Sequence, residues 1–599
     1  MRSIVSLVLL VPILALATGA TGPGTVVAPG VSLQAVTVLS SEGGAGPSGP
    51  RSELGPSREA RFTIGTVDTV GGTTYDFQTN GPAYRMLTRT PGKGVHVLFM
   101  WSQATDTLFR DRNMRYNFYD SSVHAWNWLD PDFMSSGVSV FPTPPRVGYG
   151  SIDLDTNGRA VISAHHVTPA GIAPMLARDA EVGQGLFDYV FGESTGLDQN
   201  VWPYVAVGQN GAYHLAMIDN VSQDNLYWTR MTSWPTWESR VGIPSPQPEP
   251  NSPNQNIATS KGPGSNKVCI TWVVTPASGY AQMPGFYRES QDGGDNWDLP
   301  VDIGFPSSTF GPDTIPSYAQ GSLFPLYDRY NRLHIVASVI PFTRETSWVI
   351  PGQIWHWSAA NPDTWNLIHA VSPDSWMGDI PGGSQVCCRP SLGEDDRGNL
   401  FVAWEEFSGT NVDPTTNVLR ADIWYSYSTD NGVTWAESTM ITDGGDVTYR
   451  FPSVLDPIGD TVMVTYMIDQ QAGYWVQGAE GSPTNNPVAV QKWANPAPGV
   501  EGPKVVSPAR MDVTAGPDPF RRSTRVSYAV PHRGKVSLVI FDAVGRNVRT
   551  LVDGRSEPGR FSAVWDGRSQ SGALVPGGVY LYRYALDGKR MTGKLTLTR

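Results

Sequence analysis

The sequence predicts an all-β protein built from at least two domains. Three observations indicate this. The chain has 599 residues, which is too long for one ordinary hydrophobic core. It contains 63 Gly and 49 Pro together with 20 Trp and 23 Tyr, a composition typical of many turns between aromatic-rich strands. Short strand-like runs recur along the chain, whereas runs with a helical period are hard to find.

The overall charge disfavours two classes of partner. The formal net charge is -12 and the isoelectric point is about 5.3. A broad basic face for phosphate backbones is therefore not expected, so nucleic acid is a poor candidate partner. The same acidic surface disfavours adhesion to anionic lipid.

The N-terminus has the order of a secretory signal peptide. Arg2 is followed by an apolar run from Ile4 to Ala17, and cleavage is expected after Ala17 or Ala20. A run of about 14 apolar residues is short for a membrane span, and we expect no transmembrane segment in the mature chain. We therefore predict a signal peptide over residues 1–20, a Gly/Pro/Ser-rich linker over 21–58, and a location outside the cytoplasm.

The three cysteines are too few for a disulfide framework. Cys269 lies in an apolar strand-like run, and Cys387 and Cys388 are neighbours. Either Cys269 forms one bridge to one of the pair, or all three are buried free thiols. No Cys/His spacing typical of zinc and no nucleotide-binding loop is present, so neither a metal nor a cofactor is expected.

Residues 62–495 contain a repeated hairpin. Each copy has a turn with Gly or Asn and then an apolar strand, and copies recur about every 50 to 70 residues, enough for one four-stranded sheet each. The seven copies lie at 92–101, 156–165, 209–218, 265–274, 330–339, 397–406 and 459–468. This predicts a β-propeller of six or seven blades, in which segment 63–81 is a candidate for the strand that closes the last blade.

A second motif, S-x-D-x-G-x-x-W, falls between the hairpins at 290–297 and 428–435. A degenerate copy at 358–365 keeps the Ser and the Trp. Ser and Asp oxygens can accept backbone N–H bonds inside a tight turn, Gly permits its backbone conformation, and Trp covers it. The motif residues are Ser290, Asp292, Gly294 and Trp297 in the first copy, and Ser428, Asp430, Gly432 and Trp435 in the second.

These two motifs resemble the Asp boxes of sialidase-type (BNR repeat) β-propellers, and the resemblance covers roughly residues 62–495. In that family the boxes lie at the blade periphery. The resemblance therefore implies that Asp292 and Asp430 are structural rather than catalytic. The family's enzymes usually have six blades, whereas seven hairpins are present here, so the sequence leaves the blade number open.

The C-terminal region has its own pattern after a Pro/Gly-rich linker at 496–516. Strand-like alternation appears at 523–530, 535–542, 561–567 and 578–586, with turn residues between these runs. Residues 517–599 are therefore expected to form an immunoglobulin-like β-sandwich.

This region resembles the immunoglobulin-like domain of FlgD and the C-terminal sorting domains of type IX secretion. The matching residues are Pro519-Phe520, Phe541-Asp542, Gly545-Arg546, Trp565-Asp566-Gly567, Pro576, Gly578-Val579-Tyr580 and Gly593-Lys594-Leu595. The resemblance implies contact with a secretion machinery, passage across an outer membrane, and release or attachment at a bacterial cell surface. A plain structural module is the alternative, and the sequence does not say whether the domain is cleaved.

Three arginines are the candidate ligand-binding residues. The sialidase family holds a sugar carboxylate with three arginines, the first in an F/Y-R-x-P motif, and guanidinium groups suit that task. Residues 448–452 contain Y-R-x-P with Arg450, and Arg85 and Arg389 occupy similar places in two other repeats. They fall in blades one, six and seven, so an anion-binding cluster at the propeller mouth is one hypothesis. The other is that x-P-S belongs to the repeat itself, because it recurs in RPSLGED and FPSVLDP.

No catalytic residue can be assigned, because no Tyr–Glu nucleophile pair stands out. The first hypothesis is a non-catalytic secreted or surface-displayed propeller that binds a glycan or a protein. The alternatives are a diverged exo-glycosidase of the sialidase type and a structural or adhesion component of the surface. The sequence does not identify the ligand or the oligomeric state.

Overall fold

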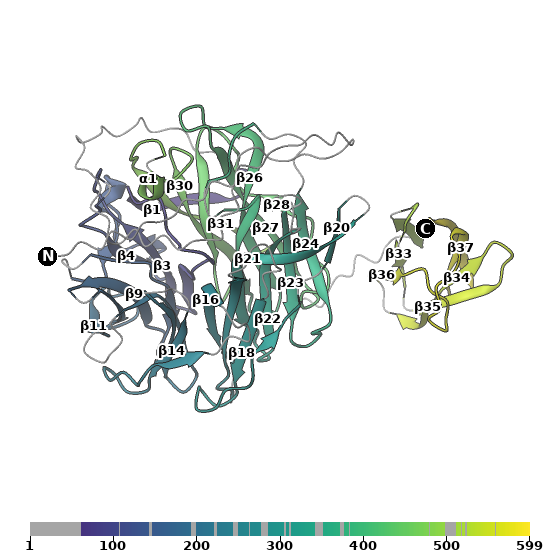
Figure 1. The fold of residues 1–599 in the computed structure, drawn as a ribbon, viewed down its shortest axis with the longest axis horizontal. Helices are drawn as coiled ribbons and strands as arrows, with labels where there is room; N and C mark the ends of the chain where they lie inside the picture. Colours follow the sequence, from purple (N-terminus) through teal and green to yellow (C-terminus); the bar gives the residue numbers. More distant parts are fainter. Residues whose placement is uncertain are drawn as a thin grey trace. The chain divides into compact units, whose positions relative to one another are not determined.

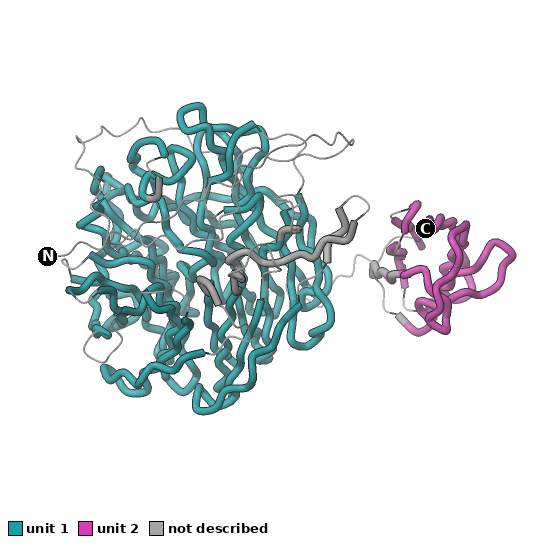
Figure 2. The backbone as a smooth tube through the Cα atoms, viewed as in Figure 1, with its two compact units in different colours: residues 1–497 teal, residues 498–599 magenta. Residues whose placement is uncertain are grey.

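The computed structural model describes residues 62–497 and 511–598, with short gaps. These gaps are 107, 143–145, 170, 193–198, 221–224, 244–249, 263, 277–284, 305–306, 311–312, 342–351, 372–376, 382–383, 479, 517, 522–523, 533 and 557–558. The chain divides into two compact units, one ending at Ala497 and the other beginning at Pro498 (Figure 2). The predicted signal peptide and the linker at 21–58 lie outside the described residues.

The first unit is a β-propeller whose described residues form seven small antiparallel sheets (Figure 1). Blade 1 contains β2 (Leu87–Thr90), β3 (Gly94–Trp101), β4 (Asn113–Asp120) and β5 (Ala125–Trp126), with β6 (Val138–Ser139) against β4. Blade 2 contains β7 (Val147–Gly148), β8 (Ile152–Leu154), β9 (Ala160–Thr168), β10 (Gly171–Asp179) and β11 (Phe187–Phe191). Blade 3 contains β12 (Asn200–Val207), β13 (Tyr213–Asp219), β14 (Leu226–Met231) and β15 (Val241–Ile243).

Blades 4 to 7 continue the same order. Blade 4 contains β16 (Pro250–Thr259), β17 (Val268–Pro276), β18 (Gly285–Ser290) and β19 (Val301–Asp302). Blade 5 contains β20 (Ser307–Phe310), β21 (Asp313–Tyr327), β22 (Leu333–Pro341), β23 (Gly352–Ser358) and β24 (Trp365–Val371). Blade 6 contains β25 (Cys387–Glu394), β26 (Leu400–Val412), β27 (Leu419–Ser428) and β28 (Thr439–Met440). Blade 7 contains β29 (Thr448–Val454), β30 (Thr461–Asp469), β31 (Asn486–Ala494) and β1 (Thr66–Thr73). Two short helices, η1 (Phe133–Ser135) and α1 (Trp475–Gly478), lie in connections.

The ring closes through the N-terminal strand, which resolves the predicted blade number to seven. Strand β1 pairs antiparallel with β31, from Thr66 opposite Lys492 to Thr73 opposite Asn486. Segment 63–81 therefore does contribute the closing strand. Residues from both ends of the unit complete one sheet, which ties the first repeat to the last.

Each predicted hairpin supplies the turn and the second strand of a blade, from β3 through β30. The turns use one local device. In blade 2, Asp155 Oδ1 accepts the backbone N–H groups of Asn157 and Arg159, each at 2.9 Å. Asp328 and Asp395 do the same in blades 5 and 6. These aspartates therefore serve the turn rather than a ligand.

The two S-x-D-x-G-x-x-W motifs form the turns between the third and fourth strands of blades 4 and 6. Gly294 N–H donates to Ser290 Oγ at 2.8 Å, and Asn296 N–H donates to Asp292 Oδ1 at 2.8 Å. Gly432 and Thr434 make the same bonds to Ser428 and Asp430, also at 2.8 Å. These are the backbone bonds that the motif's chemistry predicts.

Each of these turns also locks its blade to the preceding one. Arg230 of blade 3 donates to the Gly293 carbonyl at 2.7 Å, and the rings of Trp228 and Trp297 meet edge to face at 5.2 Å. In blade 5, Arg332 donates to Asn431 Oδ1 at 2.6 Å, and His356 lies against Gly432. The motif is thus an element of blade packing.

The x-P-S repeat bonds one inner strand to the next. Val454 N–H of blade 7 donates to Ser391 Oγ of blade 6 at 2.9 Å, and Met86 N–H of blade 1 donates to Ser453 Oγ of blade 7 at 3.0 Å. Ser151 accepts the N–H of Val205 in the same way at 2.9 Å. The recurrence of x-P-S therefore has a structural cause in the repeat, as the second sequence hypothesis states.

A buried segment, residues 74–86, fills part of the propeller axis, and we call it the central segment. Every residue in it except Arg85 is buried. It links blades across the ring: Gln78 bonds the backbone of Met100, Tyr204 donates to the Pro82 carbonyl at 3.3 Å, and Asn256 donates to the Ala83 carbonyl at 3.2 Å. Atoms of the central segment therefore fill the axis where the inner strands begin.

The second unit is a two-sheet β-sandwich around a core that includes Trp565 and Tyr584. One sheet contains β32 (Asp512–Gly516), β33 (Thr524–Val530) and β36 (Gly559–Trp565); the other contains β35 (Asn547–Ser556), β34 (Gly534–Asp542), β37 (Gly578–Leu586) and β38 (Lys589–Leu597). Strand β32 lies within the stretch that the sequence assigned to the linker, 496–516. The strands that sequence alternation missed, β32, β35 and β38, are edge strands, where polar and charged residues weaken the pattern.

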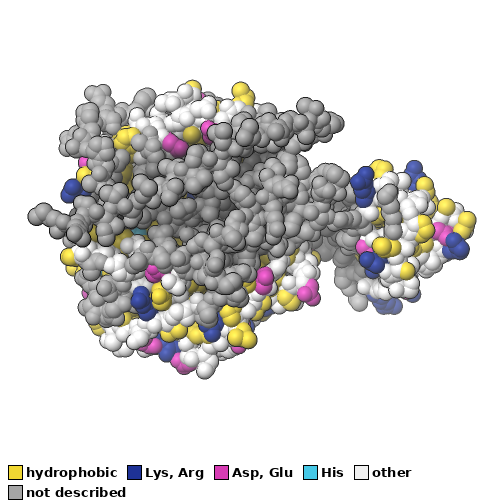
Figure 3. Space-filling view, viewed as in Figure 1, with side chains coloured by type: hydrophobic (Ala, Val, Ile, Leu, Met, Phe, Trp, Pro, Cys, Tyr) yellow, Lys and Arg dark blue, Asp and Glu magenta, His cyan; other side chains and the backbone are white. Residues whose placement is uncertain are grey.

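All three cysteines are buried free thiols. The predicted alternative of a bridge from Cys269 to Cys387 or Cys388 is therefore wrong. Within the part of the chain that the structure describes, no helix has the length and apolarity needed to cross a membrane. On the face of the propeller shown in Figure 3, described charged side chains of both signs are scattered, and no broad basic patch appears.

Candidate functional site

Two of the three predicted arginines meet, and they do so on a buried glutamate. Arg389 Nη1 contacts Glu405 Oε1, and Arg450 Nε lies 3.2 Å from Glu405 Oε2. Glu405 also accepts the Phe451 N–H at 2.8 Å, and Arg450 donates to the Tyr474 hydroxyl. Burial by itself would raise the pKa of Glu405, but the charges of Arg450 and Arg389 hold it at about 2. The positive charges of Arg389 and Arg450 are thus paired with the carboxylate of Glu405.

The third arginine, Arg85, lies elsewhere. Its Nη1 donates to Asp456 Oδ2 at 2.6 Å. The serine bonds between blades explain the separation. Met86 and Val454 each donate to the serine of the preceding blade, so they occupy equivalent positions in the repeat. Arg85 is therefore equivalent to Ser453. Arg85 is therefore two or three residues further along its strand than Arg389 and Arg450, roughly 7–10 Å at about 3.3 Å per residue. The three arginines do not form one cluster.

Two more buried carboxyl groups lie near Arg450, on the central segment and at the end of β30. Asp76 accepts the N–H groups of Trp475 and Val476, the first at 2.5 Å. Burial raises the pKa of Asp76 to about 7 despite these bonds, and burial together with Asp76 raises the pKa of Asp469. Asp76 thus joins the central segment to helix α1, which follows strand β30 of blade 7.

A cavity of about 540 Å³ lies at the other end of the axis, where the seven inner strands end. Its lining comes from all seven blades. Six carboxyl side chains contribute to it: Asp153, Asp155, Glu394, Asp395, Asp396 and Asp456. Three cationic side chains contribute as well: Arg89, Lys261 and Arg329. Because equivalent strand ends of a radial repeat meet at the axis, the fold itself gathers these groups.

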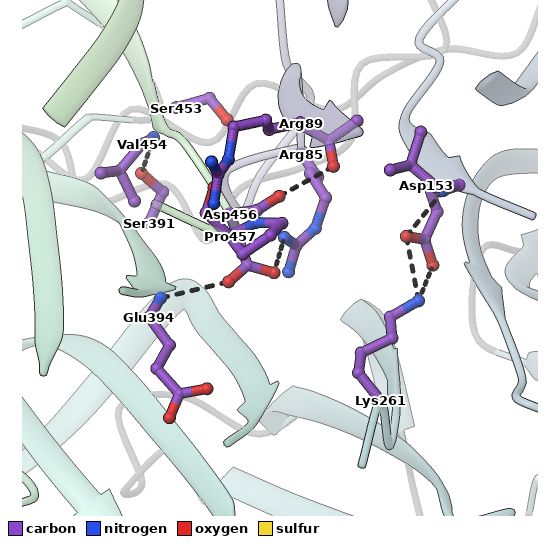
Figure 4. A network of polar contacts seen from close by, with 12 residues as sticks. Arg85, Arg89, Asp153, Lys261, Ser391, Glu394, Ser453, Val454, Asp456 and Pro457 are labelled. Atoms are coloured by element: carbon purple, nitrogen blue, oxygen red, sulfur yellow. Dashed lines mark hydrogen bonds and ion pairs between the residues drawn. The ribbon is translucent and has the colours of Figure 1, made fainter. Parts of the chain in front are cut away.

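One side of the cavity is formed by an ion pair between blades 2 and 4 (Figure 4). Lys261 Nζ lies 3.0 and 2.8 Å from the two carboxylate oxygens of Asp153, and it donates to the Val207 carbonyl at 3.0 Å. Asp153 is 6% exposed and also accepts the Val207 N–H at 2.7 Å. The backbone of Val207 in blade 3, which lies between blades 2 and 4, holds both members of the pair in place.

The opposite side belongs to blades 1, 6 and 7. Asp456 binds Arg85 and accepts the Glu394 N–H at 3.1 Å. Arg89 donates to the Pro457 carbonyl at 2.9 Å and to both oxygens of Asp396, at 2.9 and 3.0 Å. The predicted ligand residue Arg85 thus supports this wall through Asp456, although it does not line the cavity.

Glu394 differs from the other carboxyl groups. It is only 9% exposed, its Oε2 accepts the Arg329 N–H at 2.8 Å, and its Oε1 has no hydrogen-bond partner among the described residues. Burial, and after it the charge of Asp456, raise the pKa of Glu394 to about 8. At neutral pH this carboxyl group is therefore mostly protonated, while the paired carboxylates around it have cations or several donors.

Sequence reasoning did not single out these cavity residues. A signal was present, because Asp153, Glu394 and Asp456 all lie at or just after the end of an inner strand, one or two residues before the turn. Aligning the repeats on their turns would have collected the three acids. Lys261 carries no such signal, since its role follows from the ring geometry. Among the described residues, no three His, Cys, Asp or Glu side chains are arranged to hold a metal ion.

A Tyr–Glu hydrogen bond lies at the edge of the cavity. Tyr327, at the end of β21, belongs to the cavity lining and donates to Glu289 Oε1 at 2.5 Å. Glu289 lies on β18, the third strand of blade 4, and is not among the lining residues. The tyrosine of this pair thus reaches the cavity, whereas the glutamate lies behind it.

Comparison with known proteins identifies the second unit. Residues 523–588 match the family described as FlgD Ig-like domain, as the C-terminal motifs predicted. Phe520 and Trp565 of those motifs pack together in the core at 5.5 Å, and Tyr580 donates to the Pro576 carbonyl at 2.6 Å. The C-terminal unit is a FlgD Ig-like domain. No curated protein sequence matches the chain.

Several solved structures are similar to this chain at low identity. An ulvan lyase, a polysaccharide lyase solved with a GlcA–Rha3S saccharide, is 11% identical, with 71% of this chain and 94% of that chain covered and a TM-score of 0.44. A lectin from Burkholderia pseudomallei is 12% identical, with coverages of 69% and 96% and a TM-score of 0.40. An α-L-arabinanase from Penicillium chrysogenum is 14% identical, with coverages of 59% and 97% and a TM-score of 0.36. None of these similarities defines the chemistry of the present chain.

Proposed function

We propose that this protein is an exported, surface-attached propeller that binds a saccharide without acidic groups in its axial cavity, and that it does not cleave this ligand. The observation that carries the proposal is the cavity of about 540 Å³, which all seven blades line and into which six of them bring charged side chains. This volume lies in the range of about 300–1,000 Å³ typical of small-ligand sites.

The lining suits a ligand rich in hydroxyl groups. A sugar hydroxyl both donates and accepts, and the cavity offers carboxylate oxygens as acceptors beside ammonium and guanidinium groups as donors. Most of these side chains are fixed by ion pairs, as Asp153 and Lys261 are, so little side-chain entropy would be lost on binding.

The existing contacts of the cationic groups disfavour an acidic sugar. The three cations of the lining each contact protein acceptors, as Lys261 does with Asp153 and Arg89 with Asp396. The arginines that a sialidase-type site would need are committed elsewhere, since Arg389 and Arg450 share Glu405 and Arg85 binds Asp456. These contacts support a non-acidic ligand over the sialidase-type alternative.

The state of Glu394 supports binding over hydrolysis. A glycosidase needs a proton donor that touches the glycosidic oxygen and a second carboxylate across the bond. Glu394 holds a proton at neutral pH, but Asp153, Asp396 and Asp456, which could supply the second carboxylate, are each paired with a cation. These pairings support binding over hydrolysis.

Export and surface attachment are supported by both ends of the sequence. The first 20 residues have the charged, apolar and small-residue order of a signal peptide, and the C-terminal unit is a FlgD Ig-like domain. Cell fractionation of a bacterial host that makes the full chain tests this. We expect the protein at the outer surface, and removal of residues 517–599 should leave it inside the envelope. Equal surface display without this region would refute the sorting role.

Binding is tested with a glycan array followed by calorimetry. We expect retention of neutral or basic glycans and no retention of sialylated or uronic-acid glycans. Lys261→Met should weaken binding at least tenfold, because it removes a charged donor worth roughly 1.5–3 kcal/mol. Glu238→Gln is the matched control, since it breaks an ion pair with Arg230 on blade 3 outside the cavity. Preferential binding of acidic glycans, or equal binding by the Lys261 variant, would contradict the proposal.

A further inference from the structure

Two of the cavity's six carboxyl groups make no ion pair among the described residues, and one of these two has few partners of any kind. Asp153 binds Lys261, Asp396 binds Arg89, Asp456 binds Arg85, and Asp155 binds Arg159 at 2.6 Å. Asp395 makes no ion pair, but it accepts two turn N–H groups and the side-chain amides of Asn399 and Asn495. Glu394 makes no ion pair either, and its one hydrogen bond to the side chain comes from the Arg329 backbone.

The surroundings of Glu394 explain its protonation. The side chain is 9% exposed, and the negative charge of Asp456 is nearby. In Figure 4 its carboxyl group points away from Asp456 and lies across the open space from the Asp153–Lys261 pair. A buried acceptor that lacks both a partner and a counter-ion is costly, unless a ligand supplies one.

We propose that the ligand is an amino sugar whose protonated amino group is held at Glu394 in the axial cavity. This inference rests on the proposed saccharide binding and adds the chemical class of the ligand. An ammonium group supplies both the missing positive charge and up to three N–H donors, whereas a hydroxyl group supplies one donor and no charge.

The three cations of the lining leave less opportunity for a carboxylate ligand. Lys261 is held by Asp153 and the Val207 carbonyl, and Arg89 by Asp396 and the Pro457 carbonyl. Arg329 contacts the Asp396 carbonyl. An anionic ligand would have to break these contacts.

Binding of an amine at Glu394 has a signature that binding of a neutral sugar lacks. The carboxyl group ionises when the ammonium group pairs with it, and its proton passes to the buffer. With a pKa of about 8 in the free protein, roughly 0.9 proton is available for release at pH 7. Close pairing with a cation lowers the pKa of a carboxyl group, so most of that proton should leave.

The test is isothermal titration calorimetry of the mature chain with three matched sets of sugars. Each set contains a hexosamine, its N-acetyl derivative and the parent hexose, in the gluco, galacto and manno series. Measurements at pH 6.5 in two buffers of different ionisation enthalpy count the protons released. We expect one hexosamine to bind at least tenfold more tightly than its hexose and its N-acetyl derivative, with close to one proton released.

Glu394→Gln provides the matched variant. Its amide has the shape of the protonated carboxyl group, so the propeller should fold as before. It should abolish proton release and reduce the amino-sugar preference to less than threefold. Asp460→Asn is the control, because it makes the same change from acid to amide at a side chain that is 94% exposed and outside the cavity lining. It should change neither the proton release nor the amino-sugar preference.

The outcomes separate the two proposals. If a hexose or an N-acetyl sugar binds as tightly as the hexosamine, or if the wild-type protein releases no proton, the amino-sugar inference is wrong while saccharide binding stands. If none of the sugars and no glycan on the array binds, the proposed function fails as well. The wild-type proton count decides the question even if the Glu394 variant does not fold.

Discussion

The buried contact of Glu405 with two arginines makes a quantitative prediction for the substitution Glu405→Gln. In the folded protein the pKa of Glu405 falls from 4.5 to about 2, because the charges of Arg450 and Arg389 outweigh the effect of burial. That difference corresponds to about 3 kcal/mol of folding free energy at neutral pH. Glutamine keeps the shape but not the charge, and it leaves two buried guanidinium groups without a counter-ion.

The expected loss of about 3 kcal/mol should be visible in thermal and urea unfolding of the propeller. With roughly 430 residues between positions 62 and 497 and an unfolding entropy of about 2.1 cal/mol/K per residue, the propeller Tm should fall by about 3 °C. Glu238→Gln is the control, because its ion pair with Arg230 is partly exposed and should be worth less than about 1 kcal/mol.

The pH dependence distinguishes this electrostatic explanation from a packing defect. Because the folded pKa of Glu405 is depressed, its stabilisation is complete above about pH 4.5 and is lost as the pH falls toward 2. The difference in unfolding free energy between the wild type and Glu405→Gln should therefore shrink across that window. A difference below 1 kcal/mol at pH 7, or one that does not change with pH, would refute the reasoning.

Two further predictions concern the turns and the thiols. Gly432→Ala should destabilise the propeller by about 2 kcal/mol in urea unfolding, because the φ of Gly432 is 81° and a Cβ there would overlap the buried ring of His356. Gly545→Ala, at φ 85° in an open turn, should destabilise the sandwich by only about 1 kcal/mol. Equal losses of stability in the two variants would contradict the blade-locking role. Burial raises the pKa of Cys269, Cys387 and Cys388, so a thiol reagent at pH 8 should label none in the native protein and all three in denaturant, whereas fewer than three after denaturation without reductant would indicate a disulfide.

Local sequence was enough to predict the architecture. The seven turn-and-strand repeats mark seven blades, because a hairpin needs its Gly or Asn turn and its apolar strand in whatever fold it occurs. The turns around Ser290 and Ser428 also follow from local chemistry, since a side chain there bonds a backbone only two to six residues away. The C-terminal strands with the clearest alternation, such as β34 and β37, were found for the same reason, whereas the polar edge strands were not.

The candidate site was decided by tertiary structure. Arg389 and Arg450 lie near the start of the inner strands β25 and β29, whereas Arg85 lies just before β2. This shift of two or three residues in strand register sends Arg85 to Asp456 and the other two arginines to Glu405. Similarly, Lys261 meets Asp153 from 108 residues away only because two blades converge on the axis. Local pattern records the bonds that a residue makes with its neighbours in the chain. It does not record which strand ends a closed ring brings together, and the axial cavity consists of those ends.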